Sequence, residues 1–161
     1  MILRKGTVPV VKGVSTYPDP YNQGAGNLEY RHLTDAGGLT QFGAALETLH
    51  PGGVGSQTHW ESHEDEFLYM LEGEITVIED DTETVIGPGD ACVWKSGAPP
   101  AHSLRNHTDR PAVYLIMGSR DPRNVTTYPG LDMLATPTGF TTRDGTPYPK
   151  FTPKPAPGDA T

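Results

Sequence analysis

The stretch EFLYMLEGEITVIEDDTETVIGPGD, residues 66–90, contains three short runs of strand-forming residues separated by turns. The first turn lies around Gly73, and the second lies at residues 80–82, where Asp, Asp and Thr interrupt the apolar pattern. Short strand-like runs bounded by turn residues are typical of β-hairpins. Two consecutive hairpins are therefore predicted, and they indicate a β-sandwich or a β-barrel.

Similar runs continue on both sides of this stretch. They are LTQFGAALETL (39–49), ACVWKSG (91–97), HSLRNH (102–107) and PAVYLIMGS (111–119). The 161 residues include 19 Gly and 16 Pro, a content that favours many turns over long helices. The chain is long enough for one core, so we expect a single all-β domain.

Composition divides the chain into three segments. Residues 1–27 are rich in Pro and Gly and are predicted to form an N-terminal arm, whereas residues 28–120 contain nearly all the strand-like runs. Residues 121–161 hold much of the remaining Pro and form a predicted C-terminal arm. This arm has enough Tyr, Phe, Leu and Met to pack as far as Tyr148, but its last residues, KPAPGDAT (154–161), are expected to be disordered.

Charge and cysteine content exclude several classes of protein. With 12 Lys and Arg against 20 Asp and Glu, the net charge is −8, which disfavours binding to nucleic acid and to anionic membrane surfaces. Cys92 is the only cysteine, so no internal disulfide can form. The first residues lack the apolar core of a signal peptide. A soluble cytoplasmic protein with a small-molecule partner is expected.

The run at residues 66–72 is apolar on both of its faces. In a strand, Phe67, Tyr69 and Leu71 point to one side, while Leu68 and Met70 point to the other. An outer face of this kind needs a cover, because an exposed apolar sheet promotes aggregation. We therefore expect a homodimer, with the outer face against an arm or a second subunit.

Potential metal ligands precede this run. His59 and Glu61 stand two residues apart and share one side of a strand, whereas Glu66 joins that side only if the chain bends within residues 62–65. The next histidine that could converge on them is His102. Spacing alone also allows a simpler interpretation, in which these histidines are ordinary hydrogen-bonding residues and ESHEDE (61–66) is a solvated acidic loop.

The first of two segments that resemble cupin motifs lies here. The family pattern is Gly, five residues, His-x-His, four residues, Glu, six residues and Gly. The corresponding residues are Gly53, His59-Trp60-Glu61, Glu66 and Gly73. Glu61 therefore stands where the family has its second histidine.

The second segment resembles the pattern Gly, five residues, Pro-x-Gly, a short gap, His, three residues and Asn. The corresponding residues are Gly89, Lys95-Ser96-Gly97, His102 and Asn106. Lys95 replaces the proline, and the gap before His102 is longer than in the family. The resemblance, which covers residues 28–149, implies a small single-domain cupin with a double-stranded β-helix, or jelly-roll, barrel.

The resemblance also implies a site for one divalent metal ion. His59, Glu66 and His102 match the family ligands, and Glu61 would complete a set of two histidines and two glutamates. Such a set suits Mn or Fe, while Zn and Ni stay possible. Two alternatives remain: His63 takes the place of Glu61, or the metal has been lost and a binding pocket remains.

Two functions are compatible with this site. The resemblance implies a metal-dependent enzyme acting on a small polar molecule, either as a sugar-phosphate isomerase or epimerase or as a dioxygenase. Glu61 or Glu66 would then transfer protons as the catalytic residue. The alternative is a cupin without catalytic activity that binds a small molecule for sensing or storage.

Overall fold

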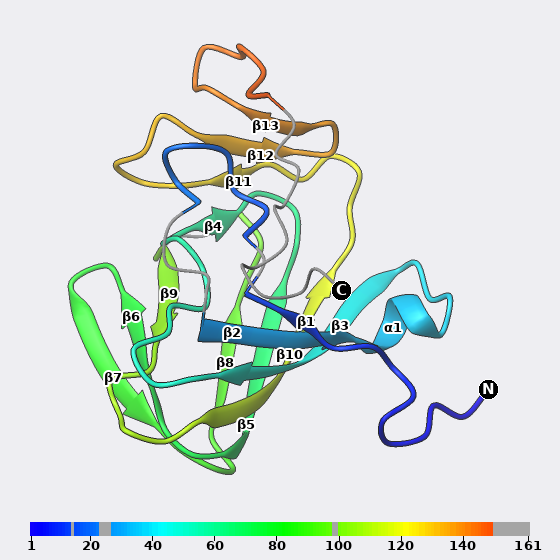
Figure 1. Ribbon diagram of the computed structural model, residues 1–161. Coiled ribbons are helices and arrows are strands. Elements are labelled where there is room, and N and C mark those ends of the chain that lie inside the picture. Colours follow the sequence, from blue (N-terminus) through cyan, green and yellow to red (C-terminus); the bar gives the residue numbers. More distant parts are fainter. Residues whose placement is uncertain (14, 23–26, 98–99, 150–161) are drawn as a thin grey trace, which may run out of the picture.

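The computed structural model describes residues 1–13, 15–22, 27–97 and 100–149, which form almost exclusively β-structure (Figure 1). The helix α1 (Leu33–Ala36) is one turn long. The predicted all-β fold is confirmed. Within the described ranges, no helix is long and apolar enough to cross a membrane. The disorder predicted for residues 154–161 falls outside the described residues.

Six strands form the largest sheet. They are β1 (Val11–Lys12), β2 (Leu28–His32), β3 (Phe42–Leu49), β5 (Glu66–Glu72), β8 (Ala91–Trp94) and β10 (Ala112–Ser119). Their order is β1-β2-β3-β10-β5-β8, and every neighbouring pair is antiparallel. Strands β3 and β10 pair over their full length and form the centre of the sheet. The main contacts therefore join segments that are far apart in the sequence.

A second sheet packs against the first and encloses the core. It has three antiparallel strands in the order β7 (Thr82–Ile86), β6 (Ile75–Glu79) and β9 (His102–Arg105). The core between the sheets contains Leu49, Leu68, Met70, Ile75, Val77, Ile86, Trp94, Leu104, Ala112 and Tyr114. Two antiparallel sheets around one core are the architecture expected of a jelly roll.

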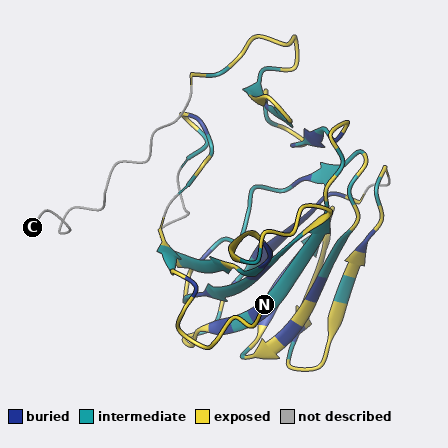
Figure 2. Cartoon of the chain, turned by 90° about the vertical axis from the view of Figure 1, so that its right-hand side faces the viewer, coloured by how far each residue is buried: buried dark blue, intermediate teal, exposed yellow. Residues whose placement is uncertain are grey.

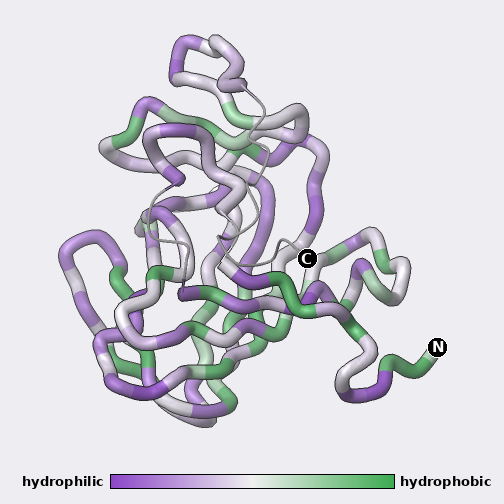
Figure 3. Tube along the Cα trace, in the orientation of Figure 1, coloured by the Kyte–Doolittle hydropathy of each residue, from purple (hydrophilic) through white to green (hydrophobic). Residues whose placement is uncertain are grey.

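Strand β5 has the two faces that its sequence predicts. Leu68 and Met70 are fully buried, whereas Tyr69 is 39% and Leu71 is 42% exposed. Figure 2 shows buried and intermediate residues on most strands of the barrel, whereas β7 is largely exposed, and Figure 3 shows both hydrophobic and hydrophilic residues along these strands. Within one chain, therefore, the inner face of β5 is covered and the outer face is partly open.

The C-terminal segment forms a third sheet with a short strand of the barrel. Its strands are β4 (Trp60–Glu61), β11 (Thr126–Thr127), β12 (Leu134–Thr136) and β13 (Gly139–Thr141). The order is β13-β12-β11-β4, at the top of Figure 1. Residues 121–149 are thus attached to the barrel beside the first cupin-like motif.

The bend expected within residues 62–65 is present. The chain leaves β4 after Glu61 and enters β5, in another sheet, at Glu66. The Ser62 N–H donates to the Val125 carbonyl at 3.1 Å, and the Asp65 N–H donates to Ser119 Oγ at 2.9 Å. These bonds fix both ends of the bend, so that Glu66 enters β5 on its inner face together with Leu68.

Candidate metal centre

His59 and His102 lie side by side because their backbones pair directly. They form an antiparallel bridge in which the His59 N–H donates to the His102 carbonyl at 3.0 Å and the His102 N–H donates to the His59 carbonyl at 2.8 Å. The two imidazole rings are 4.6 Å apart between centroids. Both side chains are almost completely buried. Two histidines from distant parts of the chain are thus held at one point inside the barrel.

Glu66 completes a ligand cluster with these two histidines. Its Oε2 atom lies 3.0 Å from His102 Nε2 and 3.6 Å from His59 Nε2. The three potential ligand atoms lie within 4.8 Å of one another. We refer to His59, Glu66 and His102 as the ligand cluster. The structure therefore brings together three of the four residues that the sequence indicated.

The donor atoms of the ligand cluster fit a divalent cation. Glu66 Oε2 is buried and makes no hydrogen bond to any described residue, although His102 Nε2 is near. The His59 Nδ1 atom lies 2.8 Å from the Gln57 carbonyl, which can only accept, so Nδ1 donates to it and Nε2 is the ring atom that faces Glu66. Two imidazole nitrogens and one carboxylate oxygen suit Mn, Fe, Ni or Zn.

The charge state of Glu66 suits a ligand. Burial by itself would raise the pKa of this carboxyl group, but the nearby rings of His102 and His59 outweigh it and lower the pKa to about 2. Glu66 is thus ionised at neutral pH. An ionised carboxylate with an unsatisfied buried oxygen is an acceptor that a cation would stabilise.

The ring of His102 is oriented by packing. The Trp94 indole stacks on it with centroids 3.9 Å apart and an interplanar angle of 8°. Trp94 Nε1 in turn donates to Glu79 Oε1 at 2.8 Å, which fixes the indole. Within the described part of the chain, His102 Nδ1 has no hydrogen-bond partner. In many metal sites a hydrogen bond to the second ring nitrogen fixes the orientation of the histidine ring, and here the stack with Trp94 fixes it.

Glu61 lies outside the ligand cluster. Its Oε1 atom accepts a 3.0 Å hydrogen bond from Thr126 Oγ1, and its Oε2 atom accepts one from Asn124 Nδ2. Burial, and next the negative charge of Glu66, raise the pKa of Glu61 to about 7. His63, the alternative ligand, is exposed and also lies outside the cluster. Neither residue is placed as the fourth ligand that the sequence suggested.

Asn106, the last residue of the second motif, is a structural residue. It is fully buried, and its Nδ2 atom donates to the carbonyls of Leu49 at 2.8 Å and Arg110 at 2.7 Å. Its Oδ1 atom accepts from the backbone and the hydroxyl group of Thr108. Asn106 therefore acts through hydrogen bonds to the backbone and to Thr108, and it is not part of the ligand cluster.

Comparison with known proteins decides the family. The model of the cupin domain matches residues 45–118. A sugar phosphate isomerase from a cupin superfamily, from Silicibacter pomeroyi DSS-3, is 33% identical, with a TM-score of 0.84 over 92% of this chain and 97% of that chain. The chain belongs to the cupin superfamily. The comparison with curated proteins gave no match.

Two further solved structures resemble this cupin. A candidate sugar phosphate isomerase from Acidithiobacillus ferrooxidans ATCC 23270 is 28% identical, with a TM-score of 0.66 over 71% of this chain and 74% of that chain. A predicted oxalate decarboxylase from Thermotoga maritima is 24% identical, with a TM-score of 0.58 over 74% of this chain and 98% of that chain. The latter likeness concerns the fold alone.

The cupin barrel carries another acid beside the ligand cluster, which sequence reasoning missed. Glu47 lies on β3 between Ala45 and Leu49, both buried, and shares their face. Burial, opposed by the hydroxyl group of Tyr114 and reinforced by the charge of Glu66, raises the pKa of Glu47 to about 7. The alternation of apolar residues in GAALETL could have shown that Glu47 points inward.

Aromatic side chains from both terminal segments cover the site of this cupin. Tyr17 lies edge-on to Tyr128 at 5.7 Å between centroids and is equally far from Phe140. Tyr17 Oη accepts a 3.3 Å hydrogen bond from the Gln57 N–H. Burial raises the pKa of both tyrosines, so both remain protonated donors. No local sequence signal links these segments to the barrel, because their contacts depend on the tertiary fold.

The site of the cupin is a cavity of about 250 Å³ with an acidic wall. Its lining includes all three residues of the ligand cluster together with Glu47, Glu61, Tyr17 and Tyr128. Among the residues that the structure describes, neither Lys nor Arg lines it. The cavity can therefore hold a cation and a small polar molecule. Its wall also carries the carboxyl groups of Glu47 and Glu61, which can take up and release protons.

Proposed function

We propose that this cupin is a metal-dependent isomerase or epimerase of a small polyhydroxy carbonyl compound. The observation that carries the proposal is the position of two further carboxyl groups, Glu47 and Glu61, which line the same cavity as the ligand cluster and whose pKa is raised by burial. General acid–base catalysis is most efficient when the pKa of the catalytic group is near the working pH. The names of the two sugar phosphate isomerases support the same reaction class.

The reaction needs a group that can both accept and return a proton. Isomerisation removes a proton from the carbon next to a carbonyl group and delivers a proton to the former carbonyl carbon, while the hydroxyl proton passes between the two oxygens of the enediol. Glu61 or Glu47 in its ionised form accepts the proton, and the resulting acid returns it, so no oxidant or reductant is consumed. A divalent ion held by the ligand cluster would stabilise negative charge on the substrate oxygen.

The charge of the cavity favours a substrate without a phosphate group. Three glutamate side chains line it, and no cationic side chain from the described residues offsets the charge of a phosphate dianion. Burying an unpaired anion is costly. The tyrosines of the cover can instead donate hydrogen bonds to hydroxyl groups. We therefore propose an uncharged sugar or a related hydroxycarbonyl compound as the substrate class.

The test is solvent hydrogen exchange. Protein loaded in turn with Mn²⁺, Fe²⁺, Zn²⁺ or Ni²⁺ is incubated in D₂O with aldoses and ketoses, each as the free sugar and as its phosphate. Nuclear magnetic resonance then measures deuterium incorporation next to the carbonyl group. We expect exchange with free sugars, and a loss of roughly 10²-fold or more in Glu61→Gln or Glu47→Gln, because general acid–base catalysis contributes that much.

The outcomes separate the candidate functions. Exchange only with sugar phosphates would overturn the substrate class, and absence of exchange with every metal and sugar would overturn the isomerase. Oxygen consumption with the Fe²⁺ protein would point to a dioxygenase instead. A sugar that raises the melting temperature without exchange would favour the alternative, a cupin that binds its ligand without turnover.

A further inference from the structure

Glu61 lies on the same side of the chain as His59, but both oxygens of its carboxylate accept hydrogen bonds from residues outside the ligand cluster. Both residues line the cavity, two positions apart. Each oxygen of Glu61 accepts a hydrogen bond from the C-terminal segment, Oε1 from Thr126 Oγ1 at 3.0 Å and Oε2 from Asn124 Nδ2. The two donors are only 7% and 9% exposed, respectively. Water therefore does not readily replace them.

The backbone sets the position of the first donor. Strands β4 and β11 are antiparallel, and their register places Thr126 directly opposite Glu61. The next pair in the register is Thr127 and Trp60. A threonine hydroxyl group in this position is within reach of the carboxylate without any change of the main chain.

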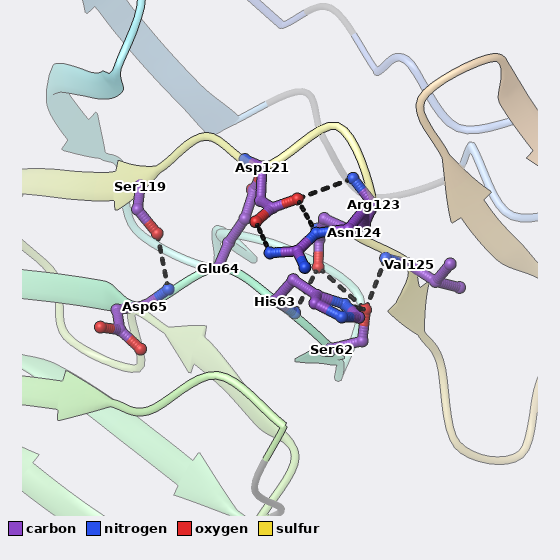
Figure 4. A network of polar contacts seen from close by, with 9 residues as sticks. All are labelled: Ser62, His63, Glu64, Asp65, Ser119, Asp121, Arg123, Asn124 and Val125. Carbon is purple, nitrogen blue, oxygen red and sulfur yellow. Dashed lines mark hydrogen bonds and ion pairs between the residues drawn. The ribbon is translucent and has the colours of Figure 1, made fainter.

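The second donor is held by the bend after β4. Asn124 Oδ1 accepts from the His63 N–H at 3.0 Å and from Ser62 Oγ at 3.3 Å, and the Val125 N–H donates to Ser62 Oγ at 2.7 Å (Figure 4). The His63 N–H can only donate, so it must face the amide oxygen. The amide nitrogen of Asn124 is consequently turned toward Glu61.

We propose that Asn124 and Thr126 are positioning residues that hold Glu61 outside the coordination shell of the metal. An ionised carboxylate in the same cavity as a divalent cation would otherwise compete to bind it, since Mn²⁺ and Fe²⁺ accept carboxylate oxygens readily. Hydrogen bonds from two buried donors offset that attraction. The ion then keeps positions open for substrate, and Glu61 stays free to move protons. The inference rests on the metal centre of the proposed function.

The first variant removes one donor while keeping its shape. In Thr126→Val the hydroxyl group is lost, and Glu61 is released on one side. We expect Mn²⁺ to bind roughly tenfold more tightly, the lower end of the range over which outer-shell partners change metal affinity. The visible absorption of bound Co²⁺ should weaken at the same time, because its coordination number rises. Asn124→Ala tests the other donor in the same way.

Two controls separate release of Glu61 from a general disturbance. Thr136 lies in the same sheet, and its hydroxyl group donates to the Gly139 carbonyl at 2.8 Å and does not contact Glu61. Thr136→Val should leave the Mn²⁺ affinity and the Co²⁺ spectrum unchanged. Adding Glu61→Gln to Thr126→Val should abolish the gain, since an amide is a poor ligand for these ions.

Each result decides between the proposals. If the parent protein binds Mn²⁺ and Thr126→Val binds it equally well with an identical Co²⁺ spectrum, the positioning role is overturned and the isomerase proposal stands. A gain that persists in the Thr126→Val, Glu61→Gln protein also overturns it. If the parent protein binds none of the four divalent ions, both the metal centre and the positioning role are overturned.

Discussion

Glu47 occupies a position where a charged carboxylate is costly. The side chain lies on the inner face of β3 next to the buried Leu49, and burial raises its pKa from an ordinary value of 4.5 to about 7. A core made only of apolar residues would be more stable at this point. The presence of an acid beside the ligand cluster agrees with the proposed proton transfer, because buried acids with a raised pKa are typical of functional sites.

The stability of the metal-free protein should fall as Glu47 ionises. The folded-state pKa lies above the unfolded value, so the folded state binds more protons between pH 4.5 and about 7. Over this interval the parent should lose up to about 3 kcal/mol of unfolding free energy from this group. Glu47→Gln lacks this loss, so its advantage over the parent should grow from pH 4 to pH 8. Urea unfolding of chelator-treated protein at both pH values measures the difference.

A difference between Glu47→Gln and the parent that is the same at pH 4 and pH 8 would show that Glu47 ionises normally. The carboxyl group would then be too acidic to act as the proposed acid and base near neutral pH. Glu83→Gln is a suitable control, because Glu83 lies on the exposed strand β7. Its substitution should give curves parallel to those of the parent.

Among the elements, the connection from β5 to β6 depends on a single glycine. The two strands lie in different sheets and do not pair, so the first of the two predicted hairpins is wrong, whereas β6 and β7 form the second. Gly73 has a φ angle of 73°, and a Cβ atom there would lie 2.6 Å from the Pro111 carbonyl oxygen and 2.9 Å from Ala112 Cα. The turn between β5 and β6 thus packs directly against the start of β10. Both the left-handed backbone and the close approach require glycine. This turn carries the chain from the large sheet, which contains β5, into the small sheet, which contains β6.

Gly73→Ala should destabilise the protein by roughly 2 kcal/mol or more, because a side chain adds a backbone collision to the cost of the left-handed conformation. Gly89 provides a matched control. Its φ angle is 95°, but a Cβ atom there would meet nothing within 4 Å. Gly89→Ala should therefore cost only the conformational part. Equal losses for both variants in denaturant unfolding would contradict the role given to the contact with β10.

At the scale of the whole molecule, the outer face of the large sheet is apolar across several of its strands. Phe42 on β3, Tyr69 on β5 and Val93 on β8 are 36%, 39% and 74% exposed, and Phe42, Phe67, Val93 and Met117 line a hollow in this face. A patch of this kind on a chain with a net charge of −8 is typical of an interface. We propose that a second copy of the chain covers it, as the sequence led us to expect.

Val93→Glu should convert the proposed dimer into a monomer, because each subunit would bury an unpaired charge in the interface. Light scattering coupled to size-exclusion chromatography measures the change. Val85 lies on β7, outside this face, and is 65% exposed, so Val85→Glu should leave the mass unchanged. A parent that is monomeric at all concentrations, or a dimer that persists in Val93→Glu, would rule out this interface.

The sequence predicted the barrel better than it predicted the C-terminal segment. The runs at 66–73, 74–81 and 82–90 correspond to β5, β6 and β7, because alternation and turn residues are local signals. Strands β11, β12 and β13 are two or three residues long and rich in Thr, and none was expected. They form only because β4 offers an edge to which β11 can pair, and that edge exists only in the folded chain.

By itself, the sequence determined the all-β fold and the cupin family, and its match to the family motifs indicated His59, Glu66 and His102 as candidate ligands. Only the tertiary structure decided what Glu61 does. Its partners, Asn124 and Thr126, are more than sixty positions away, and the β4–β11 register alone brings them to its carboxylate. A carboxylate binds whichever donor or cation is nearest, and proximity between distant segments is a property of the folded chain.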